Sequence, residues 1–305
     1  MRINTNISAL SAQEAATKTN FNIQSSLEKL SSGLRINKAS DDASGLAIAD
    51  KLRTQVTSIN QGIANGSSAV SLLQIADKSM DEQSKILDTV KAKLVQANTA
   101  TTSSAGRESI RKDIEKLLTQ LDNIASQTNY NGTKLLEGAT SAAASDALDF
   151  QVGENSSDTI TMSAVQANTD GLGLSTLKGL AADGLTTTIA AAQQTIVDSA
   201  ITSLNAYRGD VGSTQNQVES AIRNLMTQST NISAAESIIR DVDYAKESSN
   251  FNKQNIISQA GAYALSQSNA AQQNVLRLLQ WSLVGFPTKL IFIIKFWNLW
   301  FLFIF

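Results

Sequence analysis

Few residues of this chain could carry out chemistry. The sequence contains no histidine and no cysteine, which excludes the commonest general base, the commonest metal ligand, disulfides and thiolate nucleophiles. Two carboxylate groups remain, Asp41 and Asp42 beside Ser44, and Asp241 beside Asp243. The first could begin a metal site, but no further ligands follow at a calcium-loop spacing. We therefore interpret them as helix caps or junction ion pairs, and we predict a non-enzyme with no cofactor and no metal.

Two other features exclude further functions. The glycines in 170–174 (DGLGL) lack the third glycine and the strand–turn–helix context of a nucleotide site, which indicates a loop. The 25 basic and 27 acidic residues nearly cancel, so no field favours nucleic acid or anionic lipid. We expect no nucleic-acid partner.

Long helices must position whatever function the chain has. From Leu52 to Leu94, mostly apolar residues recur at steps of four and three, and the pattern resumes from Ile110 to Ile124 after a Thr- and Ser-rich break. A later stripe recurs every seven residues without a polar interruption, which is typical of helices packed in coiled-coil fashion. The predicted seam residues are Leu52, Val56, Ile59, Ile63, Val70, Leu73, Val197, Leu204, Val211, Val218, Leu225, Ile232 and Ile239.

The centre and the two ends follow other patterns. Residues 138–184 lose the helical period, and two alternating runs at 148–152 and 159–165 predict a β-hairpin; Tyr130 to Gly132 is a separate turn signal. The fold class is therefore mainly α, a long coiled-coil-like bundle with a small β-hairpin. The terminal segments, Met1–Ile36 and Ala245–Leu279, are amphipathic but sparsely apolar. They either pack on one another within the monomer or become ordered when neighbouring subunits bury them.

Five motifs at the two ends resemble the terminal regions of bacterial flagellins. The resemblance covers roughly residues 1–136 and 186–280, and the chain is also similar to the flagellins of some epsilonproteobacteria. The motifs are LSSGLRIN at 30–37, ASDDASGLAIA at 39–49, QTNYNG at 127–132, RDVDYA at 240–245 and QNVLRLL at 273–279.

This resemblance implies a short flagellin that polymerises with copies of itself into the flagellar filament. Residues 1–43 and 243–280 would pair as the inner-core helical domain, with 44–242 as an outer helical bundle carrying the hairpin near 148–165. It further implies type III flagellar export without a cleavable signal peptide, an export chaperone, and filament-cap and hook-junction partners. The residues expected to mediate self-assembly are Ile3, Ile7, Leu10, Leu27, Leu30, Leu34, Ile257, Val275 and Leu278.

One run departs from the family pattern. Flagellins recognised by the vertebrate flagellin receptor carry a run resembling LQRVRELAVQ, whereas residues 87–96 here read LDTVKAKLVQ. Thr89 and Ala92 stand where that run has an arginine and a glutamate, and threonine cannot make the bidentate bonds of arginine. We predict weak or no recognition by this receptor.

The last residues, 281–305, have no counterpart in similar flagellins. This hydrophobic tail could be a membrane anchor, although Lys295 interrupts it and the apolar run is shorter than the roughly 20 residues of a span. It could equally be AT-rich sequence read through a lost stop codon. The alternative functions are accordingly a hook–filament junction protein and a membrane-tethered coiled-coil protein.

Overall fold

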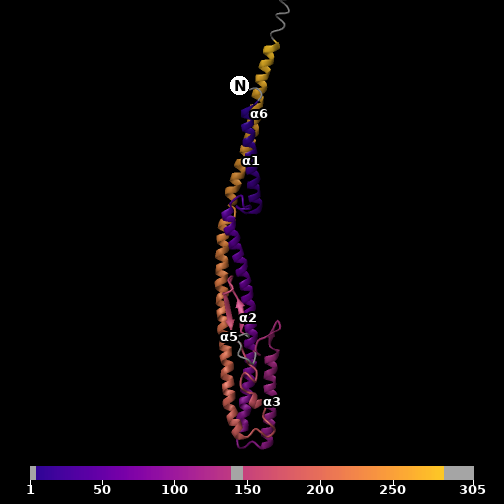
Figure 1. Ribbon diagram of the computed structural model, residues 1–305, viewed down its shortest axis with the longest axis vertical. Coiled ribbons are helices and arrows are strands. Elements are labelled where there is room, and N and C mark those ends of the chain that lie inside the picture. The colour runs from indigo at the N-terminus through magenta and orange to yellow at the C-terminus, as the bar shows by residue number, and fades with distance from the viewer. Residues whose placement is uncertain (1–4, 139–146, 285–305) are drawn as a thin grey trace, which may run out of the picture. The chain divides into compact units, whose positions relative to one another are not determined.

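The computed structural model describes residues 5–138 and 147–284, with side chains described as far as residue 278. Long helices dominate it (Figure 1), as the sequence predicted. In chain order the elements are α1 (Ile7–Ser32), α2 (Ala43–Asn98), α3 (Ser104–Gln127), β1 (Asn129–Tyr130), β2 (Thr133–Lys134), β3 (Leu148–Gln151), β4 (Thr159–Met162), α4 (Ser175–Lys178), α5 (Thr187–Arg240) and α6 (Tyr244–Val284).

The described chain packs as two compact units. We call the part up to Ala49 together with the part from Glu236 onward the terminal unit, and Asp50–Ala235 the central unit. Ile3 and the hydrophobic tail at 285–305 lie outside the described residues. None of the described helices combines the length and the apolar character that crossing a membrane requires.

In the terminal unit, α1 runs alongside α6 (Figure 1). The Asn6 side chain caps α1 by accepting from the amide of Ala9, and the helix ends at Gly33, whose φ of 74° favours glycine. Just beyond, Leu34 forms an antiparallel bridge with Asp241. The Arg35 guanidinium adds a 2.5 Å bond to the carbonyl of Ile239, so both connections of this unit are held together. The predicted pairing of the N- and C-terminal helices is confirmed.

The central unit holds the apolar core. In α2 the side chains of Leu73, Met80, Leu87 and Leu94 are fully buried at seven-residue spacing. They share one cluster with apolar residues of α3, α5 and the β3–β4 hairpin. Ion pairs join α2 to α5, with Arg208 bound to Asp77 at 3.0 Å and to Asp81 at 3.2 Å.

The predicted seam is buried most deeply toward the middle of the central unit. In α5, Val197, Leu204, Val211 and Val218 are buried, whereas Leu225, Ile232 and Ile239 are half-buried. In α2, Ile59 and Leu73 are buried, and the remaining predicted positions are half-buried: Leu52, Val56, Ile63 and Val70.

The predicted hairpin is confirmed: β3 and β4 pair antiparallel, with Leu148 opposite Met162 and Gln151 opposite Thr159. The turn at Tyr130–Gly132 is also present, with positive φ at Asn131 and Gly132. The two-residue strands β1 and β2 and the short α4 were not predicted, because segments of two to four residues show no periodicity.

The acidic residues before α2 and α6 act at helix ends, with one correction. Asp42 accepts from the amide of Gly45 at 2.9 Å, and Asp243 accepts from Ala245 and Lys246. Asp41 instead accepts from two loop amides, which lower the pKa of its carboxyl, and Ser44 lies inside α2. Its predicted capping role is therefore wrong. Among the described residues no acidic group of three or more is placed to hold a metal ion.

Candidate assembly surfaces

The stripe of α1 that faces α6 is made of small and polar residues. Its least exposed positions recur at steps of three and four, as in a coiled coil, but the only two fully buried residues of α1 are Thr19 and Ser26. The stripe comprises Ala9, Ala12, Ala16, Thr19, Ile23, Ser26 and Leu30. Such a seam removes little apolar area from water.

The facing stripe of α6 follows the same period and is also poor in aliphatic residues. Only Phe251, Leu265 and Val275 are large apolar members. The other positions are Glu247, Gln254, Ser258, Gly261, Ser268 and Gln272.

Three long side-chain hydrogen bonds join the two stripes. Asn6 Nδ2 donates to Ser268 Oγ at 3.2 Å, and Asn250 Nδ2 donates to Ser26 Oγ at 3.3 Å. Between them, Ser258 Oγ donates to Asn20 Oδ1 at 3.5 Å. The partners on α6 move toward its N-terminus as those on α1 advance, so one antiparallel register satisfies all three bonds.

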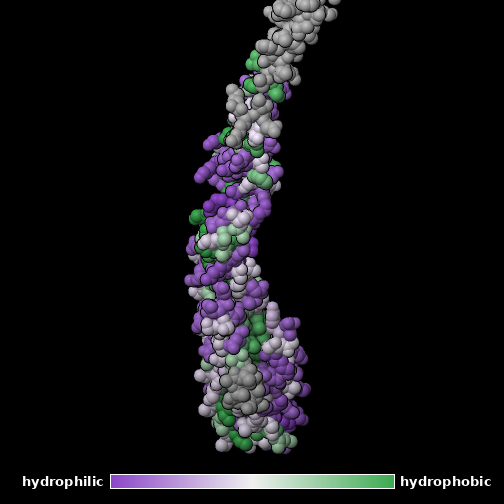
Figure 2. All heavy atoms as spheres, turned by 45° about the horizontal axis from the view of Figure 1, so that its top comes forward, coloured by the Kyte–Doolittle hydropathy of each residue, from purple (hydrophilic) through white to green (hydrophobic). Residues whose placement is uncertain are grey.

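The larger apolar side chains of the same helices point away from the seam. We call these residues the outer face; they include an exposed tyrosine, and apolar residues are visible among polar ones at the surface in Figure 2. The outer face comprises Ile7, Leu10, Phe21, Leu27, Ile256, Ile257, Tyr263, Leu276 and Leu278, which are 42–76% exposed. Monomeric soluble proteins rarely expose apolar side chains at this density.

The predicted self-assembly residues divide between the outer face and the seam. Ile7, Leu10, Leu27, Ile257 and Leu278 are exposed on the outer face. Leu30, Leu34 and Val275 are half-buried. The sequence analysis missed Phe21, Ile256, Tyr263 and Leu276, which a search for apolar residues outside the small-residue stripe would have found.

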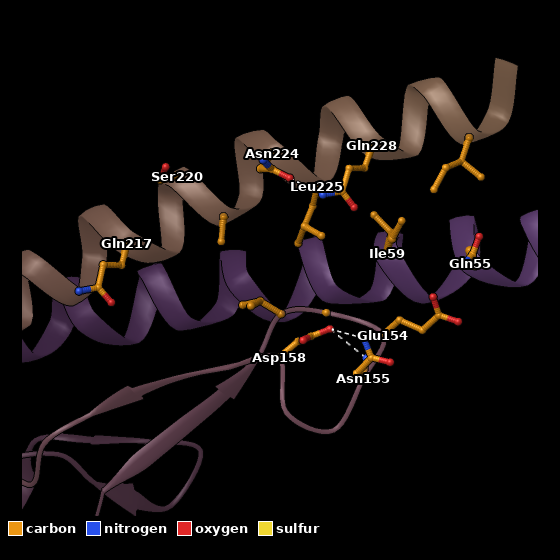
Figure 3. A pocket seen from close by; sticks show the side chains of 14 residues that line it. Gln55, Ile59, Glu154, Asn155, Asp158, Gln217, Ser220, Asn224, Leu225 and Gln228 are labelled. Carbon is orange, nitrogen blue, oxygen red and sulfur yellow. Dashed lines mark hydrogen bonds between the residues drawn. The ribbon is translucent and has the colours of Figure 1, made fainter. Parts of the chain in front are cut away.

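A polar groove of about 610 Å³ lies in the central unit between α2, α5 and the loop of the hairpin (Figure 3). Its walls carry the side-chain amides of Gln55, Gln217, Asn224 and Gln228 over an apolar floor that includes Ile59 and Leu225.

The acids of this groove are arranged to hold its loop. Asp158 accepts from both nitrogens of Asn155, at 3.1 and 3.0 Å. Glu154 stands beside them (Figure 3), and the lining residues include no lysine, arginine or tyrosine. This arrangement suits hydrogen bonding, and the lining offers no activated nucleophile or base.

Charged contacts fasten the segment after the hairpin to α3. Asp122 accepts from Thr169 N at 2.8 Å and from Lys178 Nζ at 2.6 Å. Glu108 pairs with Arg111 at 2.9 Å and accepts from the amide of Asp183, and these bonds lower the pKa of Glu108 from 4.5 to about 2.

The residues that depart from the receptor-recognised run lie on the exposed face of α2. Thr89 and Ala92 are both exposed. The Thr89 hydroxyl donates to the carbonyl of Lys85 at 2.9 Å, and Lys91 pairs with Asp198 at 2.5 Å. Both groups therefore have partners within the subunit.

Comparisons with known proteins agree with these features. The model of the bacterial flagellin N-terminal helical region matches residues 3–141, and that of the C-terminal helical region matches residues 194–279. Flagellin of Bacillus subtilis (strain 168) is 39% identical over 304 residues, which covers 92% of this chain and 100% of that protein.

Two further similarities have narrower scope. Flagellin B of Helicobacter pylori (strain J99 / ATCC 700824) is 47% identical over 172 residues, 56% of this chain and 32% of its own length. A solved structure of a putative flagellar hook-associated protein from Vibrio parahaemolyticus has a TM-score of 0.53 at 11% identity, covering 66% of this chain and 99% of that one. At this identity the second similarity supports the fold alone.

Proposed function

This chain belongs to the bacterial flagellin family and is a structural subunit of the flagellar filament, and on that premise we propose that the outer face of the α1–α6 pair is its principal assembly surface. The observation that carries this proposal is the inverted distribution of side chains on the two helices. Small and polar residues fill the seam, while Leu10, Phe21 and Leu278 are 61%, 66% and 73% exposed.

The energetics favour a second copy as the partner of this face. Burying one large aliphatic or aromatic side chain contributes about 1.5–3 kcal/mol, so a few outer-face residues are enough for specific association. The occupant is another copy because the chain polymerises, and the terminal helices of one copy are the same surface on the next. On this basis residues 1–43 and 243–280 form the inner part of the filament, with 44–242 outside them.

Reduced outer faces test this assignment. We expect the variant Leu10→Ala with Ile256→Ala to raise the critical concentration, the subunit concentration in equilibrium with polymer, by roughly tenfold or more, since each truncation removes over 1 kcal/mol of burial. Val95→Ala is the matched control, because Val95 is 55% exposed on α2 of the central unit. Sedimentation of seeded polymer measures both, and circular dichroism checks the fold. Equal critical concentrations in all three proteins would refute the assignment.

The finer partners follow from the family. We propose that an export chaperone binds the α6 segment before secretion through the type III flagellar apparatus, and that cap and hook-junction proteins contact the assembled subunits. The exposed Ile256, Tyr263 and Leu278 supply an apolar helix face of the kind that a groove-forming partner accepts. The similarity to Helicobacter pylori flagellin B supports placing the chain near the epsilonproteobacterial members.

We also propose that the vertebrate flagellin receptor recognises this subunit weakly. Thr89 is exposed but its hydroxyl is bonded to its own helix, and Ala92 offers no polar group. The variant Thr89→Arg with Ala92→Glu should increase the response of receptor-bearing reporter cells. A full response to the unchanged protein at low concentration would contradict the proposal.

A further inference from the structure

The two helix seams of this chain differ in the residues that they bury. In the central unit, α2 and α5 bury Leu73, Met80 and Leu87 against Val197 and Leu204, all at 0% exposure. In the terminal unit the equivalent positions are mostly alanine, serine, threonine and glutamine, joined by hydrogen bonds of 3.2–3.5 Å. The same chain therefore contains a strong seam and a weak one.

A weak seam leaves the pairing of α1 and α6 close to balance. The helices have 26 and 41 residues, and ordering each residue costs conformational entropy that only burial can offset. Helix propensity supplies little, because isolated helices in water are marginal and packing provides most of their stability. Long, partly exposed side-chain hydrogen bonds add little, since water competes for the same groups.

The outer face makes this balance consequential. When α1 and α6 pair, their small and polar residues meet and their large apolar residues turn outward, so the ordered pair gains most of its apolar burial from another subunit. A pair with an apolar seam would instead be stable in the free subunit and would display the outer face permanently, which favours association anywhere in solution.

We infer that the small and polar seam of the α1–α6 pair acts as a brake on self-assembly: it keeps the pair mostly disordered in the free subunit, so that the assembly surface forms only where a neighbouring copy buries it. This inference rests on the proposed role of the outer face. Its residues are separate from that face, because Thr19, Gln254 and Gln272 lie in the seam.

The inference has a quantitative consequence. If only a small fraction of free subunits has the ordered pair, the apparent affinity for the filament end is reduced by that fraction. A change that multiplies the ordered fraction must therefore divide the critical concentration by the same factor, as long as the ordered form remains the minority. A seam that only fills space between helices carries no such relation.

Seam variants of the full chain provide the experiment. Thr19→Val with Gln254→Leu and Gln272→Leu makes the seam apolar with similar side-chain volumes. Gln259→Leu with Gln273→Leu is the matched control, since both positions are exposed on α6. Hydrogen exchange of α1 and α6 amides in the free subunit reports the ordered fraction. Sedimentation of seeded and unseeded samples reports the critical concentration.

We expect the seam variant to slow exchange in α1 and α6 by roughly tenfold or more, to lower the critical concentration by a matching factor and to polymerise without seeds. The control should leave exchange in the free subunit unchanged. Unchanged exchange in the seam variant, or slower exchange with an unchanged critical concentration, would overturn the brake. Failure of the outer-face variants to affect assembly would instead remove the proposed assembly surface, so the two failures are distinguishable.

Discussion

Replacing Gly62 with alanine should destabilise the central unit, although an alanine normally stabilises a helix. Gly62 lies within α2 where the hairpin crosses it, and a Cβ there would be 2.2 Å from the carbonyl oxygen of Val152. Real Cβ atoms do not approach backbone oxygens so closely, so the hairpin must move. The neighbouring bond from Asn65 Nδ2 to the carbonyl of Gln151, 3.2 Å long, would be weakened by the same movement.

The size of the effect follows from three contributions. Helix propensity favours alanine over glycine by about 1 kcal/mol. Overpacking a close contact costs about 1–3 kcal/mol, and losing the Asn65 bond costs about 0.5–1.5 kcal/mol. The net expectation is a loss of about 1–3 kcal/mol in the free energy of unfolding. Faster hydrogen exchange should be confined to β3, β4 and the adjoining part of α2.

Gly209→Ala is the matched control for Gly62→Ala. Gly209 is exposed in α5 and a Cβ there would meet nothing within 4 Å, so only the propensity gain of up to about 1 kcal/mol remains. Urea unfolding followed by circular dichroism measures both variants, which should change stability in opposite directions. If Gly62→Ala is as stable as Gly209→Ala, the close contact between hairpin and helix does not exist as described.

Three further predictions concern the central unit. Because the pKa of Glu108 falls from 4.5 to about 2 on folding, its carboxylate stabilises the fold above pH 4.5, and this contribution is lost as the pH falls toward 2; Glu108→Gln should flatten that part of a stability–pH profile measured by urea unfolding. Leu87→Ala should cost about 2–5 kcal/mol in urea unfolding, against under about 0.5 kcal/mol for the exposed Val95→Ala, and equal costs would contradict the assigned core. Asp122→Ala should cost about 1–3 kcal/mol, since it leaves Thr169 and Lys178 without their partner; a double-mutant cycle with Lys178→Ala should show coupling, and strict additivity would refute the contact.

The sequence could predict the elements because long helices repeat one local rule many times. The seven-residue stripe from Val197 to Ile239 reports burial along a single helix, and the Thr- and Ser-rich break before Ser104 ends the preceding pattern. Alternation between Leu148 and Val165 likewise specified the hairpin. The short α4 and the two-residue strands left no such signal, since they contain too few residues to repeat anything.

Periodicity along one helix cannot say which of its faces meets which partner. For α1 the apolar residues Leu10 and Leu27 looked like the natural contact surface of a helix pair, yet the tertiary structure buries Thr19 and Ser26 and turns the leucines outward. The fully buried Gln83 is a second example: its amide binds the carbonyls of Leu121 and Ala167, which come from distant parts of the chain.

By itself the sequence determined the helical class, the hairpin, the turn at Asn131 and the family, because each depends on local spacing or on motifs in linear order. Only the tertiary structure decided the seam of the terminal pair, the outer face and the seat of the hairpin at Gly62. Those features depend on which surfaces approach across hundreds of residues, and that choice is made by the free energy of packing the whole chain.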